Sequence, residues 1–374
     1  MDNAIIDGTL GLPVKAPEVA VVILNFNGAT LLKEFVPSVL CSVASNAHFL
    51  VYIVDNGSED DSAEVAQEIA HAHPEVVKVV LLSHNQGFAG GYNEGLAQIK
   101  ADYYVLLNSD VAVSPNWLVP LVDAMERQPG LGAVQPKIRW HRNPNFFEYA
   151  GACGGFIDKW GYPFCRGRIF KRLEEDHGQY DAPVQIHWAT GACLMVRASL
   201  YHRLGGLDAD FFAHMEEIDL CWRMQHLGYR LMCIPESEVF HVGGATLDAT
   251  SPHKTYLNFR NNLALLHKNL PTARHYVVLS MRALLDALAL IVELLKGRPR
   301  HALSIGRAWI HYLIRWQHWS RMRKHINPRP LSEIGGWLNG SIVYAYFIRK
   351  IRRYDQVRPF IVYAARTEKG PPAK

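Results

Sequence analysis

"DYYVLLNSDV", residues 102–111, carries both a fold signal and a question about function. Its apolar and aromatic run predicts a buried strand. That run stops at Asn108-Ser109-Asp110, three oxygen-bearing side chains, before Val111 resumes the apolar pattern. A turn explains such residues, and so does a strand that ends by presenting oxygen atoms to a cation. The neighbouring segments have to decide between these two explanations.

Strand and helix patterns alternate through the first 110 residues. Apolar, β-branched runs at 19–25, 49–54 and 76–82 predict strands that are buried on both faces. Helical spacing predicts helices at 29–43 and 61–72. The alternation predicts βαβ units and an α/β fold with a mostly parallel sheet flanked by helices. Ligands in such sheets bind beyond the carboxyl ends of the strands.

Small or oxygen-bearing residues follow all four predicted strands. The four segments are Asn25-Phe26-Asn27-Gly28, Asp55-Asn56-Gly57-Ser58, Asn85-Gln86-Gly87 and Asn108-Ser109-Asp110. Any one of them is an ordinary turn sequence. All four on one edge of one sheet favour a polar ligand site there.

Composition limits the class of protein. The 374 residues are 49% hydrophobic and 20% charged, which is typical of a globular chain. A net charge of only +4 gives no reason to expect nucleic acid as a partner. The six cysteines contain no CxxC pair, so we expect reduced core thiols and no zinc site. We also expect no signal peptide and no membrane-spanning helix.

The pattern becomes irregular between residues 131 and 245. A loop-rich, aromatic segment at 146–168 is long enough to wrap a substrate. Residues 188–206 predict a strand and a short helix with a glycine stop, and 214–230 predict a helix that ends at Gly228. "LMCIP" and "EVFHVGG" then predict two separate short strands.

Six motifs in order resemble those of the inverting family 2 glycosyltransferases, and most closely their rhamnosyltransferase-like branch. They are "VVILNFNG", "VYIVDNGSEDDS", "NQGFAGGYNEG", "LLNSDV", "WATGACLMVRA" and "MEEIDLCWR". The resemblance covers about residues 18–270. It implies a GT-A nucleotide-diphospho-sugar transferase fold, a divalent cation (Mn²⁺ or Mg²⁺) and single displacement at the anomeric carbon of the sugar.

The resemblance assigns the metal to Asp110 and His241. Asp110 corresponds to the last acid of the family's DxD-type position, where Asn108 replaces the first. A second protein ligand is therefore wanted, and related enzymes place a histidine where "VFHVGG" has His241. An imidazole ligand suits Mn²⁺ better than Mg²⁺. The alternative for His241 is a purely structural histidine after a short strand.

The resemblance implies that the nucleotide donor binds along the ends of the predicted strands. Asp55 matches the acid that contacts the base or ribose, and Asn25 and Asn108 lie on the same edge. The "GFAGGYNEG" turn would let backbone approach the nucleotide at Gly87, with a further contact from Asn93. Close helix–sheet packing is the alternative explanation for these glycines.

Glu216 and Glu217 occupy the position of the family's acidic pair, which supplies the catalytic base. Glu217 aligns with the second member, so we predict that it takes the proton from the acceptor hydroxyl. Acids in the first turn of a helix also complement its dipole, and Asp219 has Arg223 four residues on. Trp188 and Gly191 are predicted to shape the acceptor or sugar pocket. Core packing is the alternative for Trp188.

The chain after about residue 255 is predicted to be helical, without further strands. Between Leu294 and Leu331 there are nine Lys and Arg and no Asp or Glu. Trp-rich basic segments of this kind indicate helices that lie on an anionic membrane. We therefore expect residues 272–325 to contact a membrane surface. A helical subdomain packed on the catalytic part, or a homodimer contact, is the alternative.

Together these features predict three segments: an N-terminal extension at 1–17, a catalytic domain at 18–270 and a basic, amphipathic helical region at 271–374. The predicted activity moves a sugar from dTDP-rhamnose or a UDP-sugar to a glycan or polyprenyl-diphosphate-linked acceptor in cell-surface polysaccharide synthesis. We expect a cytoplasmic protein held at the inner face of the membrane. The alternatives are a non-catalytic sugar-binding or scaffold protein of the same fold, and a sugar nucleotidyltransferase.

Overall fold

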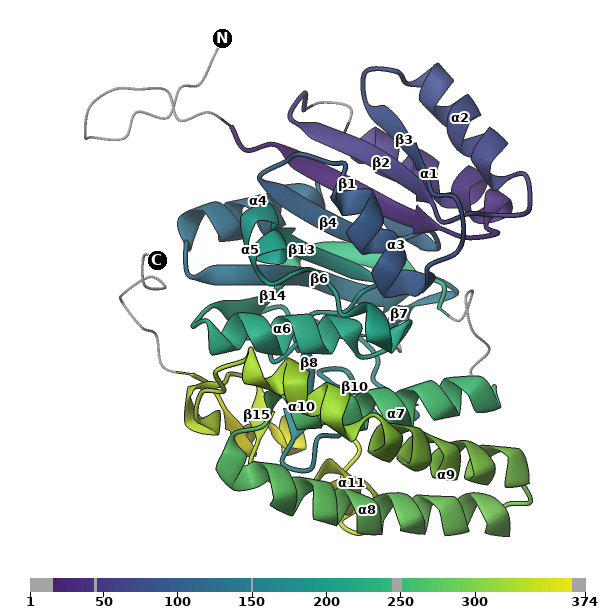
Figure 1. Cartoon of the computed structure of the whole chain (residues 1–374). Helices are drawn as coiled ribbons and strands as arrows, with labels where there is room; N and C mark the ends of the chain where they lie inside the picture. Colours follow the sequence, from purple (N-terminus) through teal and green to yellow (C-terminus); the bar gives the residue numbers. More distant parts are fainter. Residues whose placement is uncertain (1–15, 44–45, 149–150, 244–250, 365–374) are drawn as a thin grey trace.

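The structure is a computed structural model that describes residues 16–43, 46–148, 151–243 and 251–364. The predicted N-terminal extension therefore lies almost wholly outside the described residues. The chain forms two sheets. In Figure 1 the larger sheet lies above α6, and the smaller sheet lies below α6 among the C-terminal helices. In the larger sheet the strand order is β12-β14-β6-β13-β4-β1-β2-β3, with β5 beside β14 and β7 beside β6.

The first half of this sheet is parallel, as predicted. It consists of β1 (Val19–Asn25), β2 (Phe49–Asp55), β3 (Val77–Leu81) and β4 (Tyr103–Asn108). The helices α1 (Ala29–Val43), α2 (Ser62–Ala72) and α3 (Gly87–Leu96) connect these strands. The register pairs Asn25 with Asp55 and Leu24 with Asn108. The carboxyl ends of β1, β2 and β4 therefore meet on one edge.

Alternate residues of these strands enter two different cores, which explains the continuous apolar runs. Val21 of β1 packs in the core beneath α1 and α4 (Leu118–Arg127), whereas Val22 packs in the core on the other face, with Tyr92 of α3. Because both faces are covered, each strand needs apolar residues at every position.

The second half makes the sheet mixed. It contains β5 (Val111–Val113), β6 (Leu131–Trp140), β7 (Asn143–Phe147), β12 (Val184–Gln185), β13 (Cys193–Arg197) and β14 (Arg230–His241). β13 runs antiparallel to both β4 and β6. The two short strands predicted at "LMCIP" and "EVFHVGG" are wrong, because one strand, β14, spans them. Its pairing with β6 shifts between Ile234 and Glu238, which accommodates Pro235 within a long strand.

The prediction that no strands follow residue 255 is also wrong. β15 (Trp337–Leu338) and β16 (Ile361–Val362) join the smaller sheet, in which β15 runs parallel to β8 (Gly155–Asp158). The other strands of this sheet are β9 (Pro163–Cys165), β10 (Arg168–Ile169) and β11 (Arg172–Leu173). Strands of two residues carry too little periodicity to be seen in a sequence. They tie the C-terminal region to the loop-rich middle of the chain.

Helices fill the remainder of the structure. They are α5 (Ala198–Arg203), α6 (Glu216–His226), α7 (Pro252–Asn269), α8 (Thr272–Leu295), α9 (Pro299–Ile314), α10 (Trp316–Lys324) and α11 (Ile342–Phe347), with short 3₁₀ turns η1 (Ala209–Phe211), η2 (Leu331–Glu333), η3 (Tyr354–Gln356) and η4 (Arg358–Phe360). α7 lies between the sheets and the α8–α9 hairpin, and α8 forms the outermost layer (Figure 1). Among the described residues, no helix combines the length and apolar character that crossing a membrane requires.

The cysteines are free, as expected, and all except Cys41 are buried. The closest approach between two sulfur atoms is 3.7 Å, from Cys153 to Cys233.

Candidate active site

The ends of β1 and β2 hold a hydrogen-bonded pair. Asn25 Nδ2 donates to Asp55 Oδ1 at 3.1 Å, because the strand register places the two residues side by side. Ser58 closes the turn, since its N–H and its hydroxyl both donate to the Asp55 carboxylate, at 3.0 and 2.6 Å. Asn25 Oδ1 is buried without a hydrogen-bond partner among the described residues. This corner therefore presents a fixed carboxylate and a buried amide oxygen, both suited to accept hydrogen bonds.

Asn56 joins this corner to the start of α3, a role the sequence analysis missed. Its side chain donates to Asn85 Oδ1 at 3.1 Å and to the Gly87 carbonyl at 3.0 Å, and it accepts from the Gln86 N–H. Gly87 has a φ of +72°, and a Cβ there would lie 2.6 Å from the Phe212 ring. Packing against Phe212 therefore accounts for the glycine at this position.

The segment Asn108-Ser109-Asp110 has two roles in the structure. These residues turn the chain from β4 to β5, and they present a side chain at the edge. β5 pairs with β14 so that His241 lies opposite Val111, and this brings His241 beside Asp110. His241 Nε2 is 3.1 Å from Asp110 Oδ1 and 3.5 Å from Asn108 Nδ2. Two residues 131 positions apart (241 − 110) are thus brought together by strand register.

Glu148 completes this group and was not predicted. Its Oε1 is 3.3 Å from His241 Nδ1, so the ring lies between two carboxylates. All three side chains are buried. Burial opposes the charged imidazole, but contacts with Asp110 and Glu148 outweigh it and raise the pKa of His241 to about 10. The sequence signal for Glu148 is a lone acid in the aromatic segment "FFEYAG".

A divalent cation fits the Asp110–His241 pair as a two-ligand protein site. Carboxylate oxygen and imidazole nitrogen suit Mn²⁺, and a carboxylate on the far ring nitrogen is the usual outer partner of a metal-binding histidine. Within the described parts of the chain, no three or more His, Cys, Asp and Glu side chains are grouped to hold a metal. The remaining ligands would have to come from bound substrate or water.

The acidic pair lies at the start of α6. Glu216 is buried, and burial together with the nearby Glu217 charge holds its pKa well above the usual range. Glu217 is partly exposed, but its Oε2 is buried without a hydrogen-bond partner among the described residues. Burial raises the pKa of Glu217 to about 7. A carboxyl group that titrates near neutral pH is suited to accept and release a proton.

Asp219 behaves differently, although it is on the same turn. It is fully buried and hydrogen-bonded to Arg223 at 2.7 Å, Lys268 at 3.0 Å and Asn269 at 2.8 Å. Burial opposes its charge, but the two cations outweigh that effect and lower its pKa to about 2. Asp219 is therefore a structural ion-pair residue that fixes α6 to α7.

The backbone that enters α6 is strained. Phe212, His214 and Met215 have φ of 64°, 71° and 76°, the left-handed region that side chains disfavour. Asn261 of α7 holds this segment, because its Nδ2 donates to the carbonyls of Phe211, Ala213 and His214 at 3.0, 2.8 and 2.7 Å. The sequence analysis missed this role, for which the only signal was a run of polar residues, "RNN", within a helix.

Gly191 lies near both the acidic pair and α3. A Cβ at Gly191 would lie 3.0 Å from the Phe88 ring and 4.0 Å from Glu217 Cβ. The next residue, Ala192, accepts a hydrogen bond from the Asn108 N–H at 3.1 Å. Glu217 therefore faces the same edge of the sheet as Asn108 and Asp110.

Two predicted contacts are directed elsewhere. Asn93 donates to the Leu207 carbonyl at 2.7 Å, and its Oδ1 accepts from Leu207 N–H and Tyr201. Trp188 is buried, donates to the Phe156 carbonyl at 3.0 Å and packs so closely on Gly155 that a Cβ there would lie 2.2 Å from its ring. The contacts favour structural roles for Asn93 and Trp188 over direct contact with donor or acceptor.

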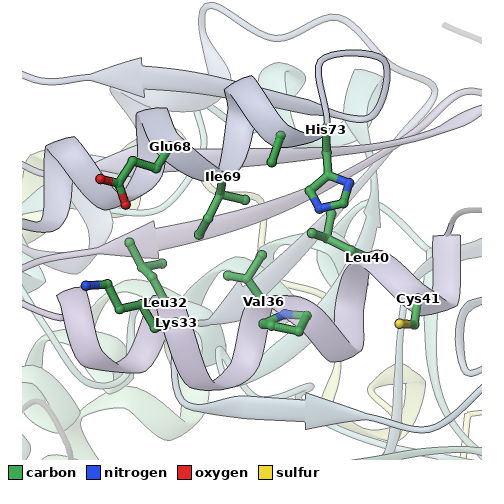
Figure 2. Close-up of a pocket in the computed structure, with 10 residues that line it drawn as sticks. Leu32, Lys33, Val36, Leu40, Cys41, Glu68, Ile69 and His73 are labelled. Atoms are coloured by element: carbon green, nitrogen blue, oxygen red, sulfur yellow. The ribbon is translucent and has the colours of Figure 1, made fainter.

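A cavity of about 420 Å³ lies away from this edge. It is a groove between α1 and α2, where Leu32, Val36 and Leu40 face Ile69 (Figure 2). None of its lining residues belongs to the groups described above.

A partly parallel sheet with flanking helices and polar side chains at the carboxyl edge of its strands is consistent with the GT-A fold. Solved structures support this fold assignment. GalNAc-T7 with UDP, GalNAc and Mn²⁺ superimposes with a TM-score of 0.54 at 18% identity, over 68% of this chain and 49% of that one. The mannosyltransferase PcManGT from Pyrobaculum calidifontis, with GDP-Man and Mn²⁺, gives 0.51 at 15% identity, over 80% and 88%.

Residues 20–205 match the family model described as "Glycosyl transferase family 2", so the chain belongs to that family. A curated relative is the N-acetylglucosaminyl-diphospho-decaprenol L-rhamnosyltransferase of Mycobacterium tuberculosis. It is 27% identical over 267 residues, which cover 67% of this chain and 81% of that protein. The O-antigen biosynthesis protein RfbC of Myxococcus xanthus is 27% identical over 238 residues, 61% of this chain and 18% of that protein. The predicted family and fold are thereby confirmed, and the chain is a glycosyltransferase.

Proposed function

We propose that this glycosyltransferase moves a sugar from a nucleotide-diphosphate donor to a hydroxyl of a lipid-linked glycan, with inversion at the anomeric carbon. The observation that carries the proposal is the position of Glu217. A carboxyl with a pKa of about 7 faces the edge that holds Asp110 and His241. In this proposal Glu217 would be the proton acceptor, across from the site where a donor diphosphate would be held.

Asp55 and Asn25 would bind the nucleoside. Two oxygens of Asp55 already accept from Ser58 and Asn25, but an ionised carboxylate has about four acceptor sites. It can therefore also accept from the N–H of uracil or thymine, or from a ribose hydroxyl. This chemistry agrees with a dTDP- or UDP-sugar as donor.

Asp110 and His241 would hold the cation, Mn²⁺ or Mg²⁺, with Asn108 beside them. The bound cation would neutralise charge on the diphosphate as it leaves. Glu217 takes the proton of the acceptor hydroxyl while the acceptor oxygen forms its bond to the anomeric carbon. The bond from that carbon to the diphosphate oxygen breaks, and its electron pair leaves with the nucleoside diphosphate. Gly191 allows the Phe88 ring to pack close to the backbone beside Glu217.

The acceptor class is proposed from the relatives. The mycobacterial relative is named for an N-acetylglucosaminyl-diphospho-decaprenol acceptor, and the myxobacterial one for O-antigen biosynthesis. We therefore infer a polyprenyl-diphosphate-linked acceptor, a role in cell-surface polysaccharide synthesis, and action at the cytoplasmic face of the membrane. A homodimer remains compatible with this function but is not required by it.

Donor hydrolysis tests the proposal. Nucleoside diphosphates of each base are first screened by thermal shift with and without Mn²⁺, and the matching donor is then followed for release of nucleoside diphosphate. We expect hydrolysis that needs the cation and is lost in Glu217→Gln, while nucleotide binding remains. If the protein binds nucleotides but releases no nucleoside diphosphate from any nucleotide-sugar donor, the non-catalytic alternative would be correct.

A further inference from the structure

Helix α8 buries its ionisable residues and exposes apolar ones. Its ionisable residues His275, Arg282 and Asp286 are 4%, 2% and 0% exposed. Leu284, Leu288 and Leu295, on the opposite side, are 67%, 57% and 82% exposed. The ionisable stripe therefore faces the protein, and the leucines face outward.

Two residues of the inward stripe, Arg282 and Asp286, bond to each other and to neighbouring elements, which fixes the orientation of α8. Arg282 donates to both oxygens of Asp286, at 3.0 and 3.3 Å, and also to the Asn262 side chain of α7. Asp286 also accepts from Trp309 of α9 at 3.0 Å and from Tyr162 at 3.3 Å. Rotating the helix to bury its leucines would break this network and leave a charge unpaired.

The outward stripe is apolar and continuous along the helix. Val277, Leu284, Leu288, Ile291 and Leu295 recur at intervals of seven, four, three and four, which places them on one face. No ionisable residue lies on that face between Arg274 and Glu293. We call these five residues the outer stripe. An exposed apolar surface of this kind is rare in a free protein and indicates a partner.

The neighbouring helix extends the same surface. On α9, Leu303, Ile310 and Ile314 are 72%, 62% and 77% exposed. A shallow groove of about 190 Å³ lies between the two helices, lined mainly by apolar or small residues such as Ala287, Leu290 and Gly306. The apolar surface therefore continues from α8 to α9.

Tryptophan does not form this surface, contrary to the sequence-based argument. Trp319 is fully buried, and Trp309 is turned inward to Asp286. The exposed residues are mainly leucine and isoleucine, with Tyr276 and Val277 near the start of α8. They favour contact with acyl chains, whereas an indole ring would lie at the headgroup level.

Basic residues lie at one end of the apolar surface. The turn between α8 and α9 carries Lys296, Arg298 and Arg300, and Lys296 and Arg298 are 53% and 56% exposed at their side chains. Glu293, which contacts Lys296 and Arg298, is 20% exposed. No acid lies between Leu294 and Leu331 in the sequence, so the hairpin presents a basic rim at this end of the apolar surface.

We infer that the α8–α9 hairpin lies on an anionic lipid membrane, with the outer stripe among the acyl chains and the basic rim at the headgroups. A second copy of the chain is a poorer occupant. A two-fold contact that set the two hairpin turns side by side would bring their basic residues together, and the nearby acid Glu293 already pairs with Lys296 and Arg298 of its own chain. The inference agrees with the lipid-linked acceptor of the proposed function but depends only on α8 and α9.

Vesicle flotation of the full-length protein tests this inference. Vesicles of phosphatidylglycerol and phosphatidylethanolamine are compared with vesicles of phosphatidylcholine alone. We expect the wild type to float with the anionic vesicles, and the double variant Leu284→Asp, Leu288→Asp to bind at least tenfold less. Val119→Asp is the matched control, because Val119 of α4 is also an exposed apolar helix residue, at 45%, and it should float as the wild type does.

A second measurement covers the case in which the double variant misfolds. Leu288→Cys in a Cys41→Ser background is labelled with an environment-sensitive fluorophore, and Val119→Cys serves as control. We expect a blue shift with anionic vesicles at position 288 only. Equal flotation of wild type and double variant, or no shift at 288, would overturn the inference. So would a wild-type dimer in light scattering that Leu288→Asp converts to a monomer, because a second copy would then cover the stripe.

Donor hydrolysis, measured on the same samples without vesicles, separates this inference from the proposed function. A protein that hydrolyses donor but does not float refutes the membrane surface alone. One that floats but hydrolyses no donor refutes the enzymatic proposal alone.

Discussion

Glu148 Oε1 lies 3.3 Å from His241 Nδ1, while Asp110 Oδ1 lies 3.1 Å from Nε2 of the same ring. The contact with Glu148 therefore orients the His241 ring so that its Nε2 points at Asp110. The arrangement relies on three distant parts of the chain. β14 supplies the histidine, the turn after β4 supplies Asp110, and the segment after β7 supplies Glu148.

Glu148→Gln is predicted to weaken Mn²⁺ binding by about 10–100-fold, because outer partners of metal-binding histidines have effects of that size. The measurement is the free Mn²⁺ signal in electron paramagnetic resonance, titrated with protein and nucleoside diphosphate. Glu174→Gln is the control, since Glu174 is another buried acid that contacts Tyr180 and Tyr354 instead. Equal Mn²⁺ affinity in wild type and Glu148→Gln would show that Glu148 does not support His241.

Glu217→Gln and Asp219→Asn are predicted to affect different properties, although the residues are two apart. The first should lower the rate, and the second should lower the stability. Glu217→Gln should lower the transfer rate by about 10²–10⁴-fold, the range of general-base catalysis. It should not destabilise the fold at neutral pH, because glutamine cannot carry the negative charge that burial disfavours at this position. Asp219→Asn should cost about 3–5 kcal/mol in the free energy of unfolding, because Lys268 and Arg223 lose their shared buried anion. Urea unfolding and steady-state rates on both variants test the pair, and a stable Asp219→Asn protein would contradict the ion-pair assignment.

The transfer rate is predicted to rise with pH through about 7, because Glu217 must be ionised to accept a proton and its pKa is about 7. Stability should change in the opposite sense. A raised carboxyl pKa means that the folded state binds more protons between the unfolded value of about 4.3 and 7. This contribution is fully present below about pH 4.3 and is lost as pH rises through 7. The difference in unfolding free energy between wild type and Glu217→Gln should therefore depend on pH in that window, and a constant difference would contradict the raised pKa.

Buried histidines predict a separate acid effect. Burial lowers the pKa of His187 and His267 to about 3 and that of His226 and His275 to about 4. The unfolded chain binds these protons near 6.5, so stability is complete above that pH and falls as pH decreases toward 4. Unfolding midpoints between pH 7.5 and 4.5 measure the effect. His187→Asn, which cannot ionise, should show a shallower decline than the wild type, and an unchanged decline would exclude His187 from the effect.

The sequence predicted the part of the site that depends on local patterns. Asn25, Asp55 and Asp110 follow apolar strands, and parallel strands of one sheet must bring such residues to one edge. Glu148 and Asn261 could not be found in this way, because their partners are set by tertiary contacts with β14 and with the 210–214 segment. The same limit explains α8. Periodicity places Arg282 and Asp286 on one stripe, but only the buried partners Asn262 and Trp309 determine that this stripe faces inward.

Asn261→Ala is predicted to lower the transfer rate about 10–100-fold while leaving nucleotide binding unchanged. Asn261 donates to three carbonyls of a segment with left-handed residues, and without it Phe212, His214 and Met215 can relax to ordinary backbone angles. Glu217 then loses its position, because it lies only two residues after Met215. Asn262→Ala is the matched control: the neighbouring side chain donates to the Gly161 carbonyl and does not touch the 210–214 segment. It should lower stability without a selective loss of turnover. A fall in nucleotide affinity equal to the fall in rate, in Asn261→Ala, would show a general loss of structure and not a displaced base.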